Sequence, residues 1–252
     1  MNPGAQLSAP HACRATQDAD GRWSVFGCCA RKMSLNVLTD GELLSKIAPE
    51  ISRARHDHFL AAVGGARNAE RALRLMVWNT EIGAALHPML QLFELATRNV
   101  IAAALKAEYG DGWTQQDEVS RWSPRIAMDI HTAKARARRT NGPVGADDIL
   151  ANLSLGFWHD ILKSCPDAFY DQRLGPKLKV LSYASKPRRR LLATVSGATR
   201  LRNRVYHLKP LINMDLRSEY DRMAHVVKRL TPWTWAVFEH KLAFDQFLAR
   251  KP

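Results

Sequence analysis

The segment at residues 201–210, LRNRVYHLKP, groups side chains that could act on a phosphodiester. Arg202 and His207 are separated by four residues, and Asn203 directly follows the arginine. A histidine that titrates near neutral pH can accept a proton from a 2′-hydroxyl. A guanidinium can bind the phosphate oxygens on which charge develops during attack. These residue types could cleave RNA without a metal, with His207 as the base and Arg202 at the phosphate.

The spacing by itself also fits a solvated basic helix end, because the chain contains 37 Lys and Arg residues. At about 100° per residue, Arg202 and His207 lie roughly 140° apart on an ideal helix, whereas Asn203 and Arg204 share a face with His207. Arg202 and His207 would converge if the helix loosened before Pro210, or if a second subunit supplied the partner.

Three segments in order carry a resemblance to a known group. RNRVYH, after an apolar helix and shortly before a proline, resembles the signature of HEPN-domain ribonucleases, and LRNRVYHLKP is similar to its form in the Abi-like (abortive-infection) branch. Residues 73–105 resemble the first helical motif of that branch, with Glu94, Arg98 and Asn99 at the matching places. Residues 153–162, LSLGFWHDIL, resemble its middle motif. Together the three segments cover most of the chain from about Ser34.

The resemblance implies an all-α, HEPN-like helical bundle with additional helices, acting as a homodimer. It implies that His207 accepts the 2′-hydroxyl proton, that Arg202 stabilises the phosphorane, and that Asn203 positions His207 or the phosphate. Arg204 would hold a neighbouring phosphate, and Glu94, Arg98 and Asn99 would complete the substrate site, with Glu94 orienting Arg98 or an arginine of the RNRVYH segment.

The products would be a 2′,3′-cyclic phosphate and a 5′-hydroxyl, with no metal or cofactor required, and DNA would be inert because it lacks the 2′-hydroxyl. The implied role is a phage-defence toxin, restrained by an inhibitor or antitoxin partner. One departure concerns Leu208 and Lys209, where related sequences often place a histidine and an acidic residue.

Two other functions fit the same residues. The first is a non-catalytic module that binds RNA or nucleotides through a basic cleft. The second is an assembly subunit in a defence system that binds an acidic partner. All three readings agree with a formal net charge of +13, which favours anionic partners.

Composition limits the class of protein. A chain of 252 residues with 46% hydrophobic residues is long enough for a sizeable core. No apolar run reaches the roughly 18 residues that would cross a bilayer. The four cysteines, Cys13, Cys28, Cys29 and Cys165, lack the spacing of a metal site, so we expect reduced thiols in a cytoplasmic protein.

The pattern along the chain predicts two regions. Residues 1–33 lack clear periodicity and are expected to form a disordered N-terminal extension, followed by a single α-helical domain at residues 34–252. No stretch alternates for long enough to predict a sheet. Helical spacing, caps and breakers predict helices at about 39–63, 68–88, 88–108, 123–139, 147–162, 191–207 and 218–230, and a last one from Thr231, with an irregular segment at 166–187.

Overall fold

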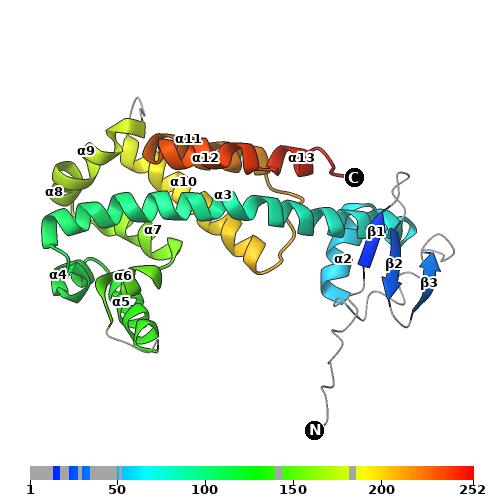
Figure 1. The fold of residues 1–252 in the computed structure, drawn as a ribbon, viewed down its shortest axis with the longest axis horizontal. Coiled ribbons are helices and arrows are strands. Elements are labelled where there is room, and N and C mark those ends of the chain that lie inside the picture. The colour runs from blue at the N-terminus through cyan, green and yellow to red at the C-terminus, as the bar shows by residue number, and fades with distance from the viewer. Residues whose placement is uncertain are drawn as a thin grey trace, which may run out of the picture. The chain divides into compact units, whose positions relative to one another are not determined.

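The computed structural model describes residues 14–17, 23–27, 30–34, 50, 53–139, 144–181 and 186–252. The chain divides into two compact units, residues 1–77 with Pro252, and residues 78–251. Helix α3 (Ala69–Tyr109) contributes to both units. Figure 1 colours the elements by residue number. The residues of the candidate site described below all belong to the second unit.

The first unit contains a small sheet that the sequence did not predict. Strands β1 (Arg14–Gln17), β2 (Trp23–Gly27) and β3 (Ala30–Ser34) pair antiparallel in that order. The pairing of β2 with β3 is irregular between Val25 and Gly27. The prediction of a disordered extension is therefore wrong for these residues. Strands of four or five residues with an irregular register are too short to give a clear period-two pattern.

Helix α2 (Arg53–Ala62) ends where the sequence predicts. Gly64 and Gly65 follow it with φ values of 88° and 100°, a region that favours glycine. The Asn68 amide then donates to the Val63 carbonyl at 2.8 Å, before α3 begins. The Thr39 capping box predicted for the start of this helix lies outside the described residues.

Helix α3 is continuous, so the predicted boundary at Pro88 is wrong. Proline lacks the N–H that would bond to the carbonyl of Ala84, and this normally kinks or ends a helix. Here the residues around Pro88 are held by burial, since Leu86, Met89 and Leu90 are nearly inaccessible. Packing of this apolar face supports the helix where its local hydrogen bonding is weakest.

The core of the second unit forms around α3. Apolar side chains on almost every turn of α3 are buried, as the sequence predicts for a helix that is apolar around much of its circumference. Helix α10 (Pro187–Tyr206) packs against α7 (Leu155–Ser164) and α11 (Leu216–Leu230). The fully buried residues of α3 include Ile82, Leu86, Met89, Phe93, Ile101, Ala104 and Leu105.

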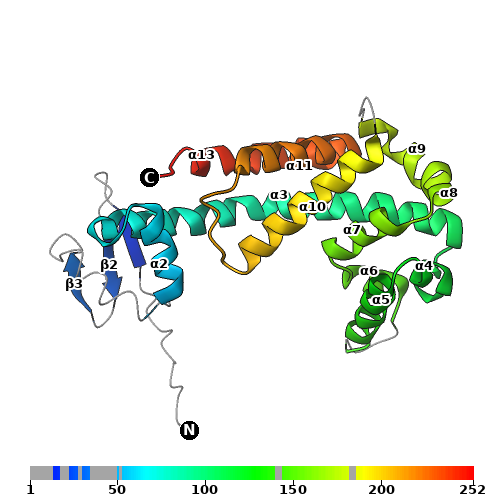
Figure 2. The same ribbon diagram turned by 180° about the vertical axis from the view of Figure 1, so that it is seen from behind.

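Two short helices precede α7. Helix α5 (Pro124–Ala137) begins as predicted, with the Ser123 hydroxyl accepting from the Arg125 amide at 3.2 Å. Asp147 and Asp148 lie in the first turn of α6 (Ala146–Ala151), as predicted. The single helix predicted at 147–162 is, however, divided into α6 and α7 by a short break. Helix α5 packs against α4 (Asp117–Arg121), α6 and α7 (Figure 2).

Over its described residues 166–181, the segment predicted to be irregular consists of short helical turns. These are α8 (Asp167–Phe169), a π-helical turn at Tyr170–Leu174, α9 (Gly175–Leu178) and a 3₁₀ turn at Lys179–Leu181. The C-terminal helix is also divided, into α12 (Pro232–Phe238) and α13 (Phe244–Leu248). From Arg53 onward the described regular elements are helices, which confirms the all-α class for that part of the chain.

Within the described residues, none of the helices combines the length and the apolar character needed to cross a membrane. Cys165 is a buried free thiol, as predicted. Burial raises the pKa of this thiol, while Arg188 opposes the shift. The other three cysteines lie outside the described residues.

Candidate functional site

Arg202 lies where α10 passes α3, and two neighbours orient its guanidinium. Its Nε is 4.0 Å from Oε2 of Glu94, on α3. Its Cζ lies 4.6 Å from the centroid of the Tyr206 ring, one turn later on α10. The Arg202 side chain is 32% exposed and that of Glu94 is 28% exposed, so both are partly accessible to solvent. The buried Arg202 Nε has no hydrogen-bond partner among the described residues.

A second histidine, which the sequence analysis did not single out, extends this group. The His87 ring lies 5.4 Å from the Tyr206 ring, centroid to centroid. His87 and Glu94 are seven residues apart on one continuous helix, which places them on the same face. The predicted helix boundary at Pro88 concealed this relation. Together, His87, Glu94, Arg202 and Tyr206 form what we call the α3–α10 site.

Among the described residues, no hydrogen bond, ion pair or ring contact joins the side chain of His207 or Asn203 to this site. Both side chains are exposed. The helix does not loosen between Arg202 and His207, because the His207 amide still donates to the Asn203 carbonyl at 3.1 Å. His207 therefore stays on the exposed side of α10, and one chain alone does not bring it to Arg202.

Arg204 supports the backbone rather than projecting freely. Its Nε donates to the Pro210 carbonyl at 3.0 Å, and its Nη2 donates to the same oxygen. This contact closes the turn after α10, where Leu208 has a φ of 52°. Arg204, which was predicted to hold a phosphate, is thus already hydrogen-bonded to a backbone carbonyl.

Two further contacts fix the segment that follows His207. The Leu211 amide donates to Oδ1 of Asn79, on α3, at 2.6 Å. The Lys251 ammonium donates to the Ile212 carbonyl at 2.8 Å. The backbone that follows His207 is therefore held by two hydrogen bonds, one to Asn79 and one to Lys251.

The other predicted substrate residues lie further along α3. Arg98 Nε donates to Asn99 Oδ1 at 3.4 Å, and this pair is exposed. Glu94 has its recorded ion pair with Arg202 rather than with Arg98. Of the two roles predicted for Glu94, the geometry favours orientation of an arginine from the RNRVYH segment.

A polar cluster joins α5, α7 and α10. His159 places Nδ1 2.9 Å from Oδ1 of Asp160 and Nε2 2.9 Å from Oγ of Ser196. The Ser196 hydroxyl also lies 2.8 Å from the Leu192 carbonyl, and Arg125 Nε lies 2.9 Å from Oδ2 of Asp160. The cluster connects three helices and supports the position of α10.

The basic residues at the start of α10 and in the run at residues 134–139 have two different environments. Arg188 bonds to the carbonyls of Leu162 and Cys165, at 3.1 and 2.7 Å, and to Asp167 Oδ1 at 2.7 Å. It therefore caps the end of α7. In contrast, the basic run on α5 leaves Arg136, Arg138 and Arg139 exposed.

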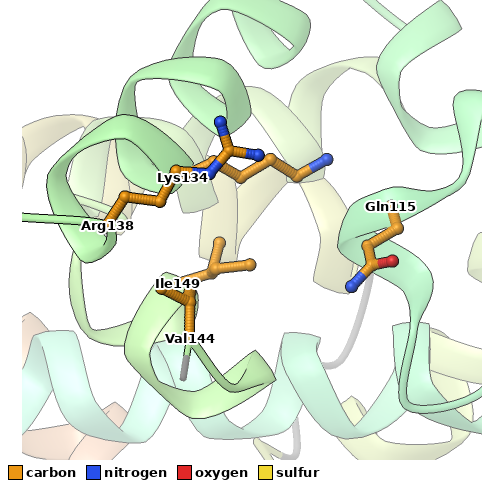
Figure 3. A pocket seen from close by; sticks show the side chains of 5 residues that line it. All are labelled: Gln115, Lys134, Arg138, Val144 and Ile149. Atoms are coloured by element: carbon orange, nitrogen blue, oxygen red, sulfur yellow. The ribbon is translucent and has the colours of Figure 1, made fainter. Parts of the chain in front are cut away.

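A pocket of about 370 Å³ opens beside this basic run (Figure 3). Its lining residues are Gln115, Lys134, Arg138, Val144 and Ile149. It shares no residue with the α3–α10 site.

Among the described residues, no cluster of three or more His, Cys, Asp or Glu side chains could hold a metal ion. Comparisons with family models, with curated proteins and with solved structures find no match to this chain.

Proposed function

We propose that this protein is a metal-independent endoribonuclease of the HEPN type that works as a homodimer. The observation that carries the proposal is the oriented Arg202 guanidinium, held between Glu94 and Tyr206 and partly open to solvent. A guanidinium fixed in this way can bind two phosphate oxygens without first being ordered. The resemblance of residues 201–210 to the HEPN signature supports the same reading.

The reaction is an in-line transesterification. His207 accepts the proton of the 2′-hydroxyl, whose oxygen attacks the adjacent phosphorus, and the bond from phosphorus to the 5′-oxygen breaks. The departing 5′-oxygen takes up a proton, and the products are a 2′,3′-cyclic phosphate and a 5′-hydroxyl. Arg202 stabilises the charge on the phosphorane oxygens.

A homodimer resolves the divergence of Arg202 and His207. Because these residues face different sides of α10, the proposal places His207 of one chain beside Arg202 of the other. Asn203, one turn before His207, then positions the histidine or the phosphate. His87 contacts Tyr206, the ring on which Arg202 lies in the same chain, so it is the competing candidate for the proton-transfer role.

The test is cleavage of an RNA oligonucleotide by purified protein in EDTA, with end-group analysis. Removing a general base typically costs about 10²- to 10⁴-fold in rate. We expect a loss of this size for His207→Ala, and a loss of about 10²-fold or more for Arg202→Ala. An all-deoxy oligonucleotide should stay intact.

His240→Ala is the matched control, because His240 is an exposed histidine outside the site. Full activity in His207→Ala with loss in His87→Ala would move the base to His87 and refute the dimeric arrangement. Equal activity in all three histidine variants would refute the mechanism.

A non-catalytic RNA-binding module is the second candidate, and the divergence of Arg202 and His207 within one chain favours it. In that case the protein binds RNA without cleaving it, and Arg202→Ala lowers affinity while His207→Ala does not.

The biological role that follows from cleavage is phage defence by abortive infection. We propose that a cytoplasmic inhibitor or antitoxin restrains the nuclease until infection. Expression of the wild-type protein without that partner should arrest growth, whereas expression of His207→Ala should not.

A further inference from the structure

We propose that the pocket beside α5 binds a nucleotide through its phosphate. This site is separate from the α3–α10 site, and the inference does not depend on RNA cleavage. Lys134 lies in the last turn of α5 and Arg138, four residues later, is the helical C-cap of α5; both lie on the same side of the pocket (Figure 3). Residues four apart on a helix are neighbours on its surface, so their charges act on one point.

The charge of this pair has no partner among the described residues. No ion pair or hydrogen bond of the Lys134 or Arg138 side chain is recorded within the described residues. The nearby Asp148 is engaged differently, since its Oδ2 accepts from the Gly145 amide at 2.8 Å. Two adjacent cations without an internal partner indicate an anionic ligand, and Arg138 offers the planar, two-pronged donor geometry that phosphate prefers.

The rest of the lining indicates an organic body attached to the phosphate. A volume of about 370 Å³ lies within the range of roughly 300–1,000 Å³ for small-molecule sites. Ile149 and Val144 supply an aliphatic surface that lies below the cations in Figure 3, opposite Gln115. Gln115 faces the cations across the pocket, and its amide offers both donors and an acceptor. A planar base packed on the aliphatic side chains, with its polar edge at Gln115 and its phosphate at Arg138, fits this arrangement.

Binding is measured by isothermal titration calorimetry with AMP, GMP, CMP and UMP, and with inorganic phosphate and adenosine. Hydrogen bonds to charged groups contribute strongly to the free energy of binding. We therefore expect at least one nucleotide to bind about tenfold or more tightly than inorganic phosphate or adenosine. Phosphate binding as tightly as every nucleotide would overturn the proposal, and so would the absence of nucleotide binding.

Variants separate the pocket from the overall positive charge. Lys134→Met and Arg138→Gln should each weaken binding about tenfold or more. Arg136→Gln removes the same charge from an exposed position outside the lining and should leave affinity within about twofold. Val144→Phe fills the pocket without changing charge and should also abolish binding. Equal losses of nucleotide affinity in Arg136→Gln and Arg138→Gln would overturn the proposal, and so would unchanged binding in Val144→Phe. Thermal melts confirm that each variant is folded.

The phosphate could belong to a free nucleotide or to the end of an RNA. The two sources are distinguished with a 2′-O-methyl RNA octamer, which cannot undergo transesterification, carrying either a 5′-phosphate or a 5′-hydroxyl. An affinity gain from the 5′-phosphate that disappears in Arg138→Gln assigns the pocket to an RNA end. Nucleotide binding without that gain assigns it to a free nucleotide. Because these measurements need no cleavage, a failed nuclease assay leaves them unaffected.

Discussion

The hydrogen bond between Asn79 and the Leu211 amide should be a main support of the turn that presents His207. Asn79 is 8% exposed and Leu211 is 1% exposed, and their bond of 2.6 Å joins α3 to the segment after α10. Asn79→Ala removes the acceptor and leaves the backbone N–H of Leu211 buried without its partner.

The expected cost follows from the burial of that N–H. A buried donor that loses its partner costs about 1–3 kcal/mol. Alanine has the better helix propensity by several tenths of a kcal/mol, which offsets part of this cost. Asn203→Ala makes the same chemical change on an exposed face of α10, where no hydrogen bond of the side chain is recorded among the described residues. The difference between the two variants isolates the buried bond, and we expect it to be about 2 kcal/mol.

The assay is urea unfolding followed by circular dichroism, with thermal melts in parallel. For a protein of this size, about 2 kcal/mol corresponds to a fall in Tm of roughly 4–8 °C. We expect Asn203→Ala to remain within about 0.5 kcal/mol of the wild type. If Asn79→Ala loses no more stability than Asn203→Ala, the Asn79–Leu211 bond does not support the turn and the reasoning is refuted.

Three further predictions concern other parts of the second unit. Arg188→Met should lower the free energy of unfolding by about 2 kcal/mol, because the carbonyls at the end of α7 lose their donor. Arg189→Met, an exposed neighbour, should change it little in the same urea titration. Burial raises the pKa of Tyr220 to about 12, so the unfolded chain loses this proton first, and stability should fall between about pH 10 and 12. Over this pH interval, the free energy of unfolding of Tyr220→Phe should fall by about 2–3 kcal/mol less than that of the wild type. Equal falls in the two proteins would contradict the raised pKa of Tyr220. Trp233 and Val237 of α12 are 87% and 69% exposed, and a Trp233→Ser/Val237→Ser variant should dissociate the proposed homodimer if α12 forms its interface. Sedimentation velocity that gives the same mass for the variant and a dimeric wild type would exclude α12 from that interface.

Most helix ends could be predicted because their causes are local. The Ser123 cap of α5 and the Gly64–Gly65 end of α2 depend on the conformations of a few adjacent residues. The acidic first turn of α6 is equally local, since it reflects the charge preference of a helix N-terminus. Such features appear in the sequence without knowledge of the rest of the chain.

The predicted secondary structure was wrong where contacts between residues far apart in the sequence override the local preference. Pro88 ends a helix by its own chemistry, yet α3 continues through it because its apolar face is buried along the whole unit. The three short strands depend on pairing with one another, and strands this short do not stand out from the pattern of a single segment.

The sequence by itself determined the helical class from Arg53 onward, the apolar character of α3 and the grouping of arginines with His207, because each follows from residue type and spacing along the chain. Only the tertiary structure decided which arginine is available. It places Arg202 beside Glu94 and Tyr206, and it commits Arg204 and Arg188 to backbone carbonyls. The physical reason is that a guanidinium binds whichever acceptor the fold brings within reach, and that acceptor lies on another turn or another helix.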